Sequence, residues 1–230
     1  MRKQVKSDLD LSRLYSLTTA ISQNLQNDDD EWEKYIVKIN GRISYVDYGE
    51  EEESDAIEAG HIEAYLLRVT AAMENGLPLV QVFDSHSSNV LEAFEVVIDS
   101  KTFGVRESLQ RLLGTEIWPG DVFFLDNVEI LPEHRGKGLG VHAVRCLFDT
   151  YARSCAVAVT KPYPLYPKAN KVLQQRGMGD PKWFKAMRYD KFKANDSTAA
   201  RKLSQLWSQV GFRKIPKSSW HVWSHFPGEF

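Results

Sequence analysis

The ten residues 131–140 constrain this chain more than any other segment, because three glycines and an arginine stand where a strand gives way to a helix. A strand is expected at 122–130, and helical spacing of apolar residues predicts the helix at 139–153. Glycine lets a backbone approach a ligand with no Cβ in the way. The first turn of a helix adds unpaired N–H groups at the positive end of its dipole. The segment therefore predicts an anion-binding turn, of the kind that holds a diphosphate.

Two phosphate-binding patterns fit this turn poorly. The P-loop pattern, Gly-x4-Gly-Lys-Ser/Thr, occurs in no window of the chain. The dinucleotide fingerprint Gly-x-Gly-x-x-Ala fits by letters at 138–143, but its first glycine should directly follow the strand, and residues 131–137 intervene. No acidic residue ends a strand about 20 residues further on, where a ribose would be held. A strand-to-helix turn that binds nothing would also have this composition.

The run Arg135-x-x-Gly138-x-Gly140, after a strand that ends Val-Glu-Ile-Leu-Pro-Glu, resembles motif A of the GNAT superfamily of acetyl-CoA-dependent N-acyltransferases. In that family the turn wraps the diphosphate of coenzyme A, and backbone N–H groups of the preceding strand bind the pantetheine arm like an added strand. The resemblance implies that the following residues bind acetyl-CoA, the expected co-substrate: Val128, Glu129, Ile130, Arg135, Gly136, Lys137, Gly138, Leu139 and Gly140.

The resemblance extends over about residues 121–225. A short apolar run at 155–160 predicts a second strand, parallel to the first and covered on both faces. An amphipathic helix at 199–210 and strands at 212–215 and 220–223 follow. The expected fold is α/β, with a GNAT-like mixed and mostly antiparallel central sheet, a splayed parallel strand pair, and helices on both faces. Residues 31–230 would form this domain, with a basic and aromatic insert at 161–195.

The first hundred residues match the family only as an antiparallel hairpin with helices. Apolar spacing predicts a helix at 9–25, and so an N-terminal helical extension over residues 1–30. Strands are expected at 35–39 and 43–48, joined by Asn40-Gly41, a strong hairpin-turn signal. Residues 62–69 favour a strand, with a helix as the alternative. Further helices are expected at 90–98 and 106–113.

The expected reaction needs a base, because an alkyl amine with a pKa near 10.4 is protonated at neutral pH. Asp126 is the first candidate, since it precedes Ile130 by four residues, where some GNAT members place an acid–base residue. Strand alternation puts it on one face with Phe124 and Val128, an apolar setting that raises a carboxyl pKa. Glu129 takes the role if a bulge shifts the alternation. Asp126 as a structural hydrogen-bond acceptor is the other interpretation.

Two positions depart from the family pattern. Many members carry a tyrosine, four residues before a Gly-Phe pair, as the acid toward the leaving thiolate. This chain has Trp207 there, and an indole N–H donates hydrogen bonds but has no accessible acid chemistry. Many members also carry a cofactor-contacting asparagine where this chain has Ala200. These departures are the reason for a second hypothesis, in which the protein is a non-catalytic acyl-CoA-binding sensor of GNAT fold.

The insert at 161–195 suggests a third function, a nucleic-acid-binding interaction domain. Up to Lys193 it carries seven lysines and two arginines against two aspartates, with interleaved aromatic residues, a composition that binds single-stranded nucleic acid. It would equally suit an acidic protein tail or the 3′-phosphate of coenzyme A. A surface subdomain with a small aromatic core is the interpretation we favour. The whole-chain charge of -2 argues against wholesale nucleic-acid binding.

Other features of the sequence set limits on location and partners. The chain begins without the apolar run of a signal peptide and contains no stretch of 18 apolar residues, so we expect a cytoplasmic protein without a membrane partner. No Cys/His cluster has zinc spacing, and we expect no metal. The acceptor can be a small amine, a protein amine or an aminoacyl group on RNA.

Overall fold

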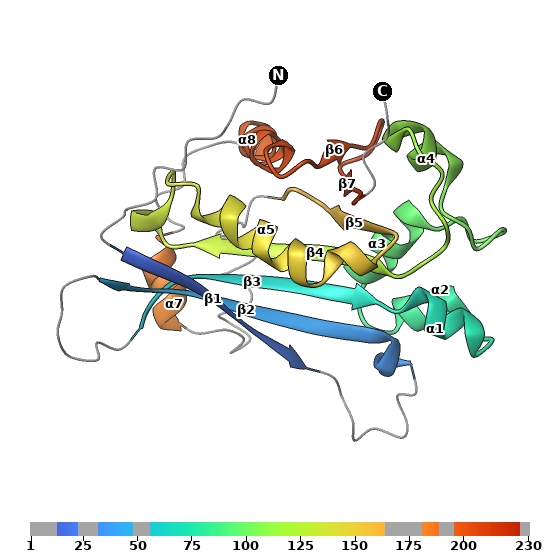
Figure 1. The fold of residues 1–230 in the computed structure, drawn as a ribbon, viewed down its shortest axis with the longest axis horizontal. Coiled ribbons are helices and arrows are strands. Elements are labelled where there is room, and N and C mark those ends of the chain that lie inside the picture. Colours follow the sequence, from blue (N-terminus) through green and yellow to red (C-terminus); the bar gives the residue numbers. More distant parts are fainter. Residues whose placement is uncertain (1–12, 23–31, 48–55, 164–180, 189–195, 226–230) are drawn as a thin grey trace.

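The computed structural model describes residues 13–22, 32–47, 56–163, 181–188 and 196–225, and its centre is one mixed β-sheet (Figure 1). The strands in the described residues are β1 (Arg13–Ser22), β2 (Ile36–Asp47), β3 (Ile57–Leu67), β4 (Val122–Ile130), β5 (Val157–Thr160), β6 (Arg213–Lys214) and β7 (His221–Trp223). The helices there are α1 (Val69–Glu74), α2 (Leu79–Asp84), α3 (Ser88–Val97), α4 (Glu107–Leu113), α5 (Leu139–Thr150), α7 (Pro181–Met187) and α8 (Asp196–Ser208).

The sheet has the strand order β1-β2-β3-β4-β5-β7-β6. Neighbouring strands run antiparallel everywhere except between β4 and β5, which are parallel. A parallel neighbour needs a crossover connection, and α5 supplies it. The predicted α/β class, with a mostly antiparallel mixed sheet and one parallel pair, is confirmed in the part of the chain that the structure describes.

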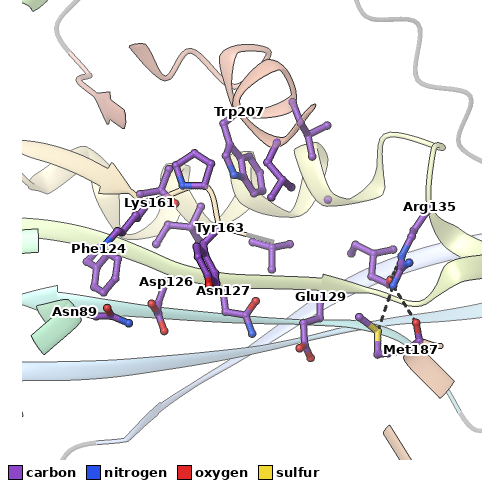
Figure 2. Close-up of a pocket in the computed structure, with 18 residues that line it drawn as sticks. Asn89, Phe124, Asp126, Asn127, Glu129, Arg135, Lys161, Tyr163, Met187 and Trp207 are labelled. Carbon is purple, nitrogen blue, oxygen red and sulfur yellow. Dashed lines mark hydrogen bonds between the residues drawn. The ribbon is translucent and has the colours of Figure 1, made fainter. Parts of the chain in front are cut away.

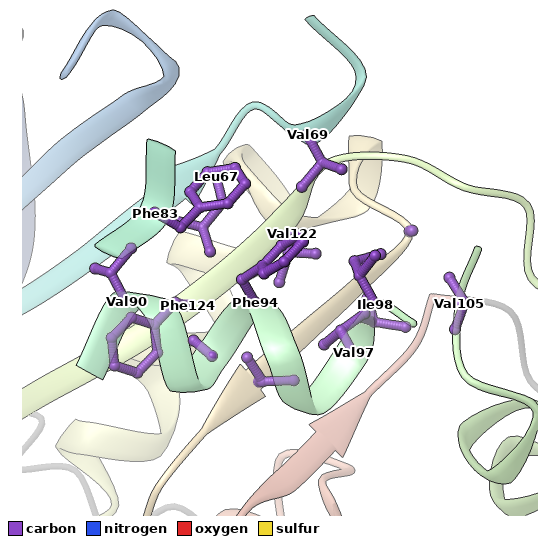
Figure 3. Packing of buried hydrophobic residues seen from close by; sticks show 14 of the residues in the cluster. Leu67, Val69, Phe83, Val90, Phe94, Val97, Ile98, Val105, Val122 and Phe124 are labelled. Atoms are coloured by element: carbon purple, nitrogen blue, oxygen red, sulfur yellow. The ribbon is translucent and has the colours of Figure 1, made fainter. Parts of the chain in front are cut away.

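Helices cover both faces of the sheet, as the sequence predicted. One hydrophobic cluster packs the four helices from α1 through α4 on one face of the sheet. In this cluster the rings of Phe83 (α2) and Phe94 (α3) stack with 4.7 Å between their centroids, and Phe124 of β4 belongs to the same cluster (Figure 3). A second cluster packs α5 and α8 on the opposite face, against Phe123 and Leu125 of the same strand. Alternate residues of β4 therefore pack into two separate cores. Packing on both faces holds this strand rigidly at the centre of the molecule.

The helix predicted for residues 9–25 is wrong where the structure describes it, because residues 13–22 form β1, the edge strand of the sheet. Tyr15 and Leu17 of β1 pack on the α5-side cluster, and their neighbours Leu14 and Ser16 are exposed. This alternation has a period of two, and Thr18 and Thr19 are β-branched residues that favour strands. The rest of the predicted helical extension, within residues 1–30, lies outside the described residues.

The hairpin predicted at Asn40-Gly41 is also wrong. Residues 36–47 form one continuous strand, in which Gly41 pairs with Thr19 on one side and Ile62 on the other. A Cβ on Gly41 would lie 3.1 Å from Leu17 Cδ1, so glycine here permits close packing of β1. Tertiary pairing has overridden a local turn signal.

The other predicted elements are present within a few residues of their expected bounds. The strand at 62–69 is β3, and the helices at 90–98 and 106–113 are α3 and α4. Ser87 caps α3 by accepting a hydrogen bond from the Val90 N–H at 3.3 Å, a common role of serine at the start of a helix. Helices α1 and α2 were not expected. Of the insert at 161–195, the structure describes residues 161–163 and 181–188, which include α7.

Candidate functional site: the gap between β4 and β5

The parallel strands β4 and β5 separate halfway along β4. They pair from Val122 with Val157 to Leu125 with Thr160, where β5 ends, while β4 continues to Ile130. On this side, residues 126–130 of β4 have no strand neighbour among the described residues. A strand edge of this kind offers N–H and C=O groups to an extended ligand. The parallel pair is therefore short, and β4 continues beyond the end of β5.

A cavity of about 620 Å³ occupies the gap (Figure 2). Its wall contains residues from both faces of the sheet: Leu125 and Trp207 belong to the α5-side core, whereas Phe124 belongs to the opposite one. The cavity thus runs through the sheet, from the start of α5 on one face to α3 on the other. The described lining residues are Asn89, Phe124, Leu125, Asp126, Asn127, Val128, Glu129, Ile130, Arg135, Gly140, Thr160, Lys161, Pro162, Tyr163, Met187, Leu203, Leu206 and Trp207.

The turn before α5 is built by its glycines. Gly136 and Gly138 have φ values of 77° and 80°, in the left-handed region that side chains with a Cβ rarely adopt. Gly138 is the N-cap of α5 and has no side chain to bond the first N–H groups of the helix. A Cβ on Gly140 would lie 3.6 Å from Ile130 Cγ1, between helix and strand.

The predicted cofactor residues fall into two groups. Val128, Glu129, Ile130, Arg135 and Gly140 line the cavity. The remaining predicted residues are not among the lining residues: Gly136, Lys137, Gly138 and Leu139. Of these, Leu139 is a buried core residue beneath the turn.

Arg135 closes the turn back onto β4. Its Nε donates to the Ile130 carbonyl at 2.7 Å, and its Nη2 donates to the Met187 carbonyl at 3.4 Å. The guanidinium thus bridges the end of β4 and the end of α7 at one end of the cavity. Because arginine is charged at every physiological pH, this end of the cavity is fixed as its cationic end.

Asp126 lies in a β-bulge, and the expected alternation of β4 is corrected there. Leu125 pairs with Ala64 and Asn127 with Glu63, so Asp126 is the extra residue. The shift turns Val128 and Ile130 toward the α5-side core, and Val128 therefore does not share a face with Asp126 as predicted. The side chains of Asp126, Asn127 and Glu129 instead project to the same side of β4 (Figure 2).

The surroundings of Asp126 raise its pKa to about 6. Burial is the main cause, the negative charge of Glu63 adds to it, and the positive charge of Lys38 opposes it. Within the described residues no hydrogen bond or ion pair joins the Asp126 carboxylate. A carboxyl that titrates close to neutrality beside a cavity is suited to exchange protons with a bound molecule.

Glu63 is held in a small network next to the bulge. Lys38 Nζ lies 2.9 Å from one Glu63 oxygen, and the Tyr65 hydroxyl donates to the other at 2.6 Å. Burial and the neighbouring carboxylates Glu63 and Asp126 raise the pKa of Tyr65 above its usual range, so the phenol stays protonated. The network keeps a second negative charge, that of Glu63 on β3, close to Asp126 on β4.

Helix α7 of the insert packs against the other predicted base, Glu129. The indole N–H of Trp183 donates to Glu129 Oε2 at 2.5 Å, and the same indole stacks on His61 at 3.9 Å between ring centroids. Trp183, Met187 and Leu131 form a small core of their own. The sequence signalled this only as aromatic residues within a basic segment, and its docking on β4 was missed.

The wall opposite β4 comes from α8 and from the chain after β5. Trp207 lies in it, buried to 6% exposure, in the position where the family resemblance led us to look for a tyrosine. Lys161 pairs with Glu92 of α3 at 2.5 Å, and Tyr163 follows two residues later with 60% of its surface exposed. Sequence reasoning missed both Lys161 and Tyr163 as site residues.

Comparisons of the chain with protein-family models, curated proteins and solved structures give no match. The described residues contain no group of three or more His, Cys, Asp or Glu side chains arranged to hold a metal ion. None of the helices in the described ranges is long and apolar enough to cross a membrane. The geometry of the gap therefore carries the functional argument.

Proposed function

We propose that this protein is an N-acyltransferase of the GNAT type, which moves an acetyl group from acetyl-CoA to an amine. The observation that carries the proposal is the cavity in the β4–β5 gap, which extends from Arg135 and Gly140, beside the start of α5, to the carboxyl of Asp126. One site thus combines an anion-binding helix start, an open strand edge and a base. Acyl transfer from a large anionic thioester needs all three.

The cofactor half rests on the turn and the strand edge. First-turn N–H groups of α5 and the charge of Arg135 suit a diphosphate. The open edge of β4 at 126–130 suits the amide-containing pantetheine arm, which would bind as an added strand. The small residue Gly140 leaves room between α5 and Ile130. A backbone N–H near Val128–Ile130 would polarise the thioester carbonyl.

The chemical half rests on Asp126. An acceptor amine must lose a proton before its nitrogen can attack the thioester carbon. A carboxyl with a pKa of about 6 is ionised at neutral pH and still accepts a proton more readily than an ordinary aspartate. Asp126 would take that proton, and the carboxamides of Asn89 and Asn127 at the same mouth would orient the acceptor. The identity of the amine does not follow from these groups.

A non-catalytic acyl-CoA sensor is the second candidate, and Trp207 favours it. The residue occupies the cavity wall with an indole, which cannot give a proton to a leaving thiolate. The two candidates share the cofactor site and differ only in turnover. A nucleic-acid-binding domain has less support, because the face of α7 that carries Trp183 is used for docking on β4.

The test has two stages. Acetyl-CoA should raise the melting temperature, because a ligand of the folded state stabilises by mass action, and NAD should leave it unchanged. Release of free coenzyme A thiol is then followed with a panel of small amines, basic peptides and aminoacyl-RNA. Stabilisation with transfer supports the enzyme, and stabilisation without transfer supports the sensor. Equal stabilisation by NAD would instead support the dinucleotide interpretation.

A further inference from the structure

Transfer of an acyl group from a thioester releases a thiolate into this cavity. A thiol has a pKa near 8.5, and the pKa rises where negative charges lie close by. Asp126 and Glu129 line the same cavity, with Glu63 next to it. A proton donor at the sulfur would therefore favour departure of the thiol, and the question is which side chain supplies it.

The described lining residues leave few candidates for that donor. Trp207 and the two carboxamides donate hydrogen bonds but do not give up protons near neutral pH. Arg135 stays charged at all relevant pH values and is bonded to Ile130 and Met187. The ammonium of Lys161 lies 2.5 Å from a Glu92 oxygen and over the ring of Trp220, and is held there away from a bound sulfur.

Tyr163 is the remaining lining group with suitable acid chemistry, since a phenol has a pKa near 10. Thr160 ends β5, and Pro162 and Tyr163 continue the chain along the gap at the point where β5 no longer pairs with β4. Asp126 lies on the opposite side of the gap, on β4. A thioester held along the β4 edge would have the carboxylate on one side and the phenol on the other.

We propose that Tyr163 is the proton donor to the leaving thiolate, a role that rests on the acyltransferase function proposed above. The acceptor ammonium first gives one proton to Asp126, which releases it to water. The neutral amine nitrogen then attacks the thioester carbon, and its surplus proton passes to Asp126. The carbon–sulfur bond breaks with its electron pair on sulfur, and the Tyr163 hydroxyl gives its proton to that sulfur, leaving a phenolate. A proton then moves through water from Asp126 to Tyr163 and restores both groups.

The experiment uses the full chain and whichever amine the acceptor panel identifies. Tyr163→Phe removes only the hydroxyl, and because the residue is 60% exposed the fold should tolerate the change. We expect kcat to fall about 10²-fold, as for loss of a general acid, with the acetyl-CoA affinity unchanged. Tyr151→Phe is the matched control, since the Tyr151 hydroxyl bonds Thr19 outside the cavity. The control should keep wild-type kcat.

A second measurement is independent of turnover. The ultraviolet absorbance of bound coenzyme A reports ionisation of its thiol. A phenol that hydrogen-bonds the sulfur stabilises the thiolate, so the thiol pKa in the wild-type complex should be lower than in the Tyr163→Phe complex. The pH–kcat profile should also lose its basic limb in the variant, because that limb reports ionisation of the acid.

The outcomes separate the two proposals. Wild-type turnover that persists in Tyr163→Phe, with an unchanged thiol pKa, overturns the role of Tyr163 and leaves the acyltransferase intact. Failure of the wild type to bind acetyl-CoA, or to transfer to any amine, overturns both. Loss of kcat in Tyr151→Phe as well would show a general effect of removing hydroxyls and would also contradict the proposal.

Discussion

The Trp183 indole N–H donates to Glu129 Oε2 across 2.5 Å, and this bond ties the insert to the strand that carries Asp126. Trp183 also stacks on His61 of β3, so one side chain clamps two neighbouring strands. Glu129 is thereby oriented by a donor, whereas Asp126 has no hydrogen bond within the described residues. The two carboxylates on the same face of β4 therefore differ in their surroundings: Glu129 is bonded to α7, and Asp126 lines the cavity without such a partner.

Trp183→Phe should loosen α7 without disturbing the sheet. A phenyl ring can still stack on His61, but the N–H donor and part of the buried indole ring are lost. The lost bond to a charged acceptor alone should cost on the order of 1–2 kcal/mol. Hydrogen exchange should accelerate at residues 181–188 and stay unchanged in β4. Uniformly faster exchange over the whole chain would contradict a local anchor. Phe184→Leu, on the same helix, is a control that keeps the indole.

Asp126→Asn should abolish base catalysis while acetyl-CoA still binds. We expect kcat to fall by about 10²–10⁴, the usual contribution of a general base. In the wild type, activity should rise with pH through about 6, as the raised pKa of Asp126 brings the carboxylate into its ionised form. Glu129→Gln is the comparison. Loss of turnover in that variant alone, with Asp126→Asn active, would transfer the role to Glu129.

The same carboxyl should also be visible in the pH dependence of stability. Its pKa of about 6 in the folded state lies above the value of about 3.9 expected for an unfolded chain. The folded state thus binds more protons between these values, and the contribution of Asp126 to stability falls as the pH rises through this window. Asp126→Asn should therefore melt at a higher temperature than wild type above pH 6. Thermal melts should show the difference narrowing from pH 6 to pH 4.

How far the sequence predicts this fold depends on whether the signal is local. Residues 122–160 were predicted closely, because an apolar strand, a glycine turn and an amphipathic helix are each written in neighbouring residues. β1 was taken for a helix, because Leu17 and Ile21, four residues apart, share a face in a helix and in a strand alike. Only pairing with β2 decides between them. The Asn40-Gly41 signal failed for the same reason.

The candidate site was predicted in part. The turn glycines, Arg135 and the edge of β4 follow from the motif-A pattern, and all belong to one continuous segment. The bulge at Asp126 depends on the register between β3 and β4, which no local pattern encodes. Trp183 and Tyr163 lie far from the motif along the chain. Only the tertiary fold brings Trp183 to Glu129 and Tyr163 to the cavity wall.

Arg135→Glu should abolish stabilisation by acetyl-CoA. The substitution places a negative charge where the diphosphate would bind, and like charges in a confined site repel. Because Arg135 also bonds the Ile130 and Met187 carbonyls, the ligand-free melting temperature should be measured beside the ligand-induced shift. Arg135→Lys keeps the charge and should retain part of the shift. A full shift of the melting temperature in Arg135→Glu would show that the diphosphate does not bind at this end of the cavity.

The basic face of α7 should be separable from the acetyl-CoA site. Lys182, Lys185 and Arg188 are exposed, while Trp183 and Met187 of the same segment are buried against the sheet. Affinity for single-stranded RNA through such a face should be weak and should fall steeply with salt, with a log–log slope of about -0.7 for each phosphate contact. Charge reversal at all three residues should weaken RNA binding further and leave the acetyl-CoA affinity unchanged.

Both affinities of this triple variant should be measured at two salt concentrations. The two buried residues are untouched, so α7 should stay docked, and hydrogen exchange at residues 181–188 provides the control. Should acetyl-CoA affinity collapse while RNA affinity holds, the basic residues would belong to the cofactor site, where the 3′-phosphate of coenzyme A is the natural anion for them. Loss of RNA affinity alone would show that the exposed face of α7 binds RNA independently of the acetyl-CoA site.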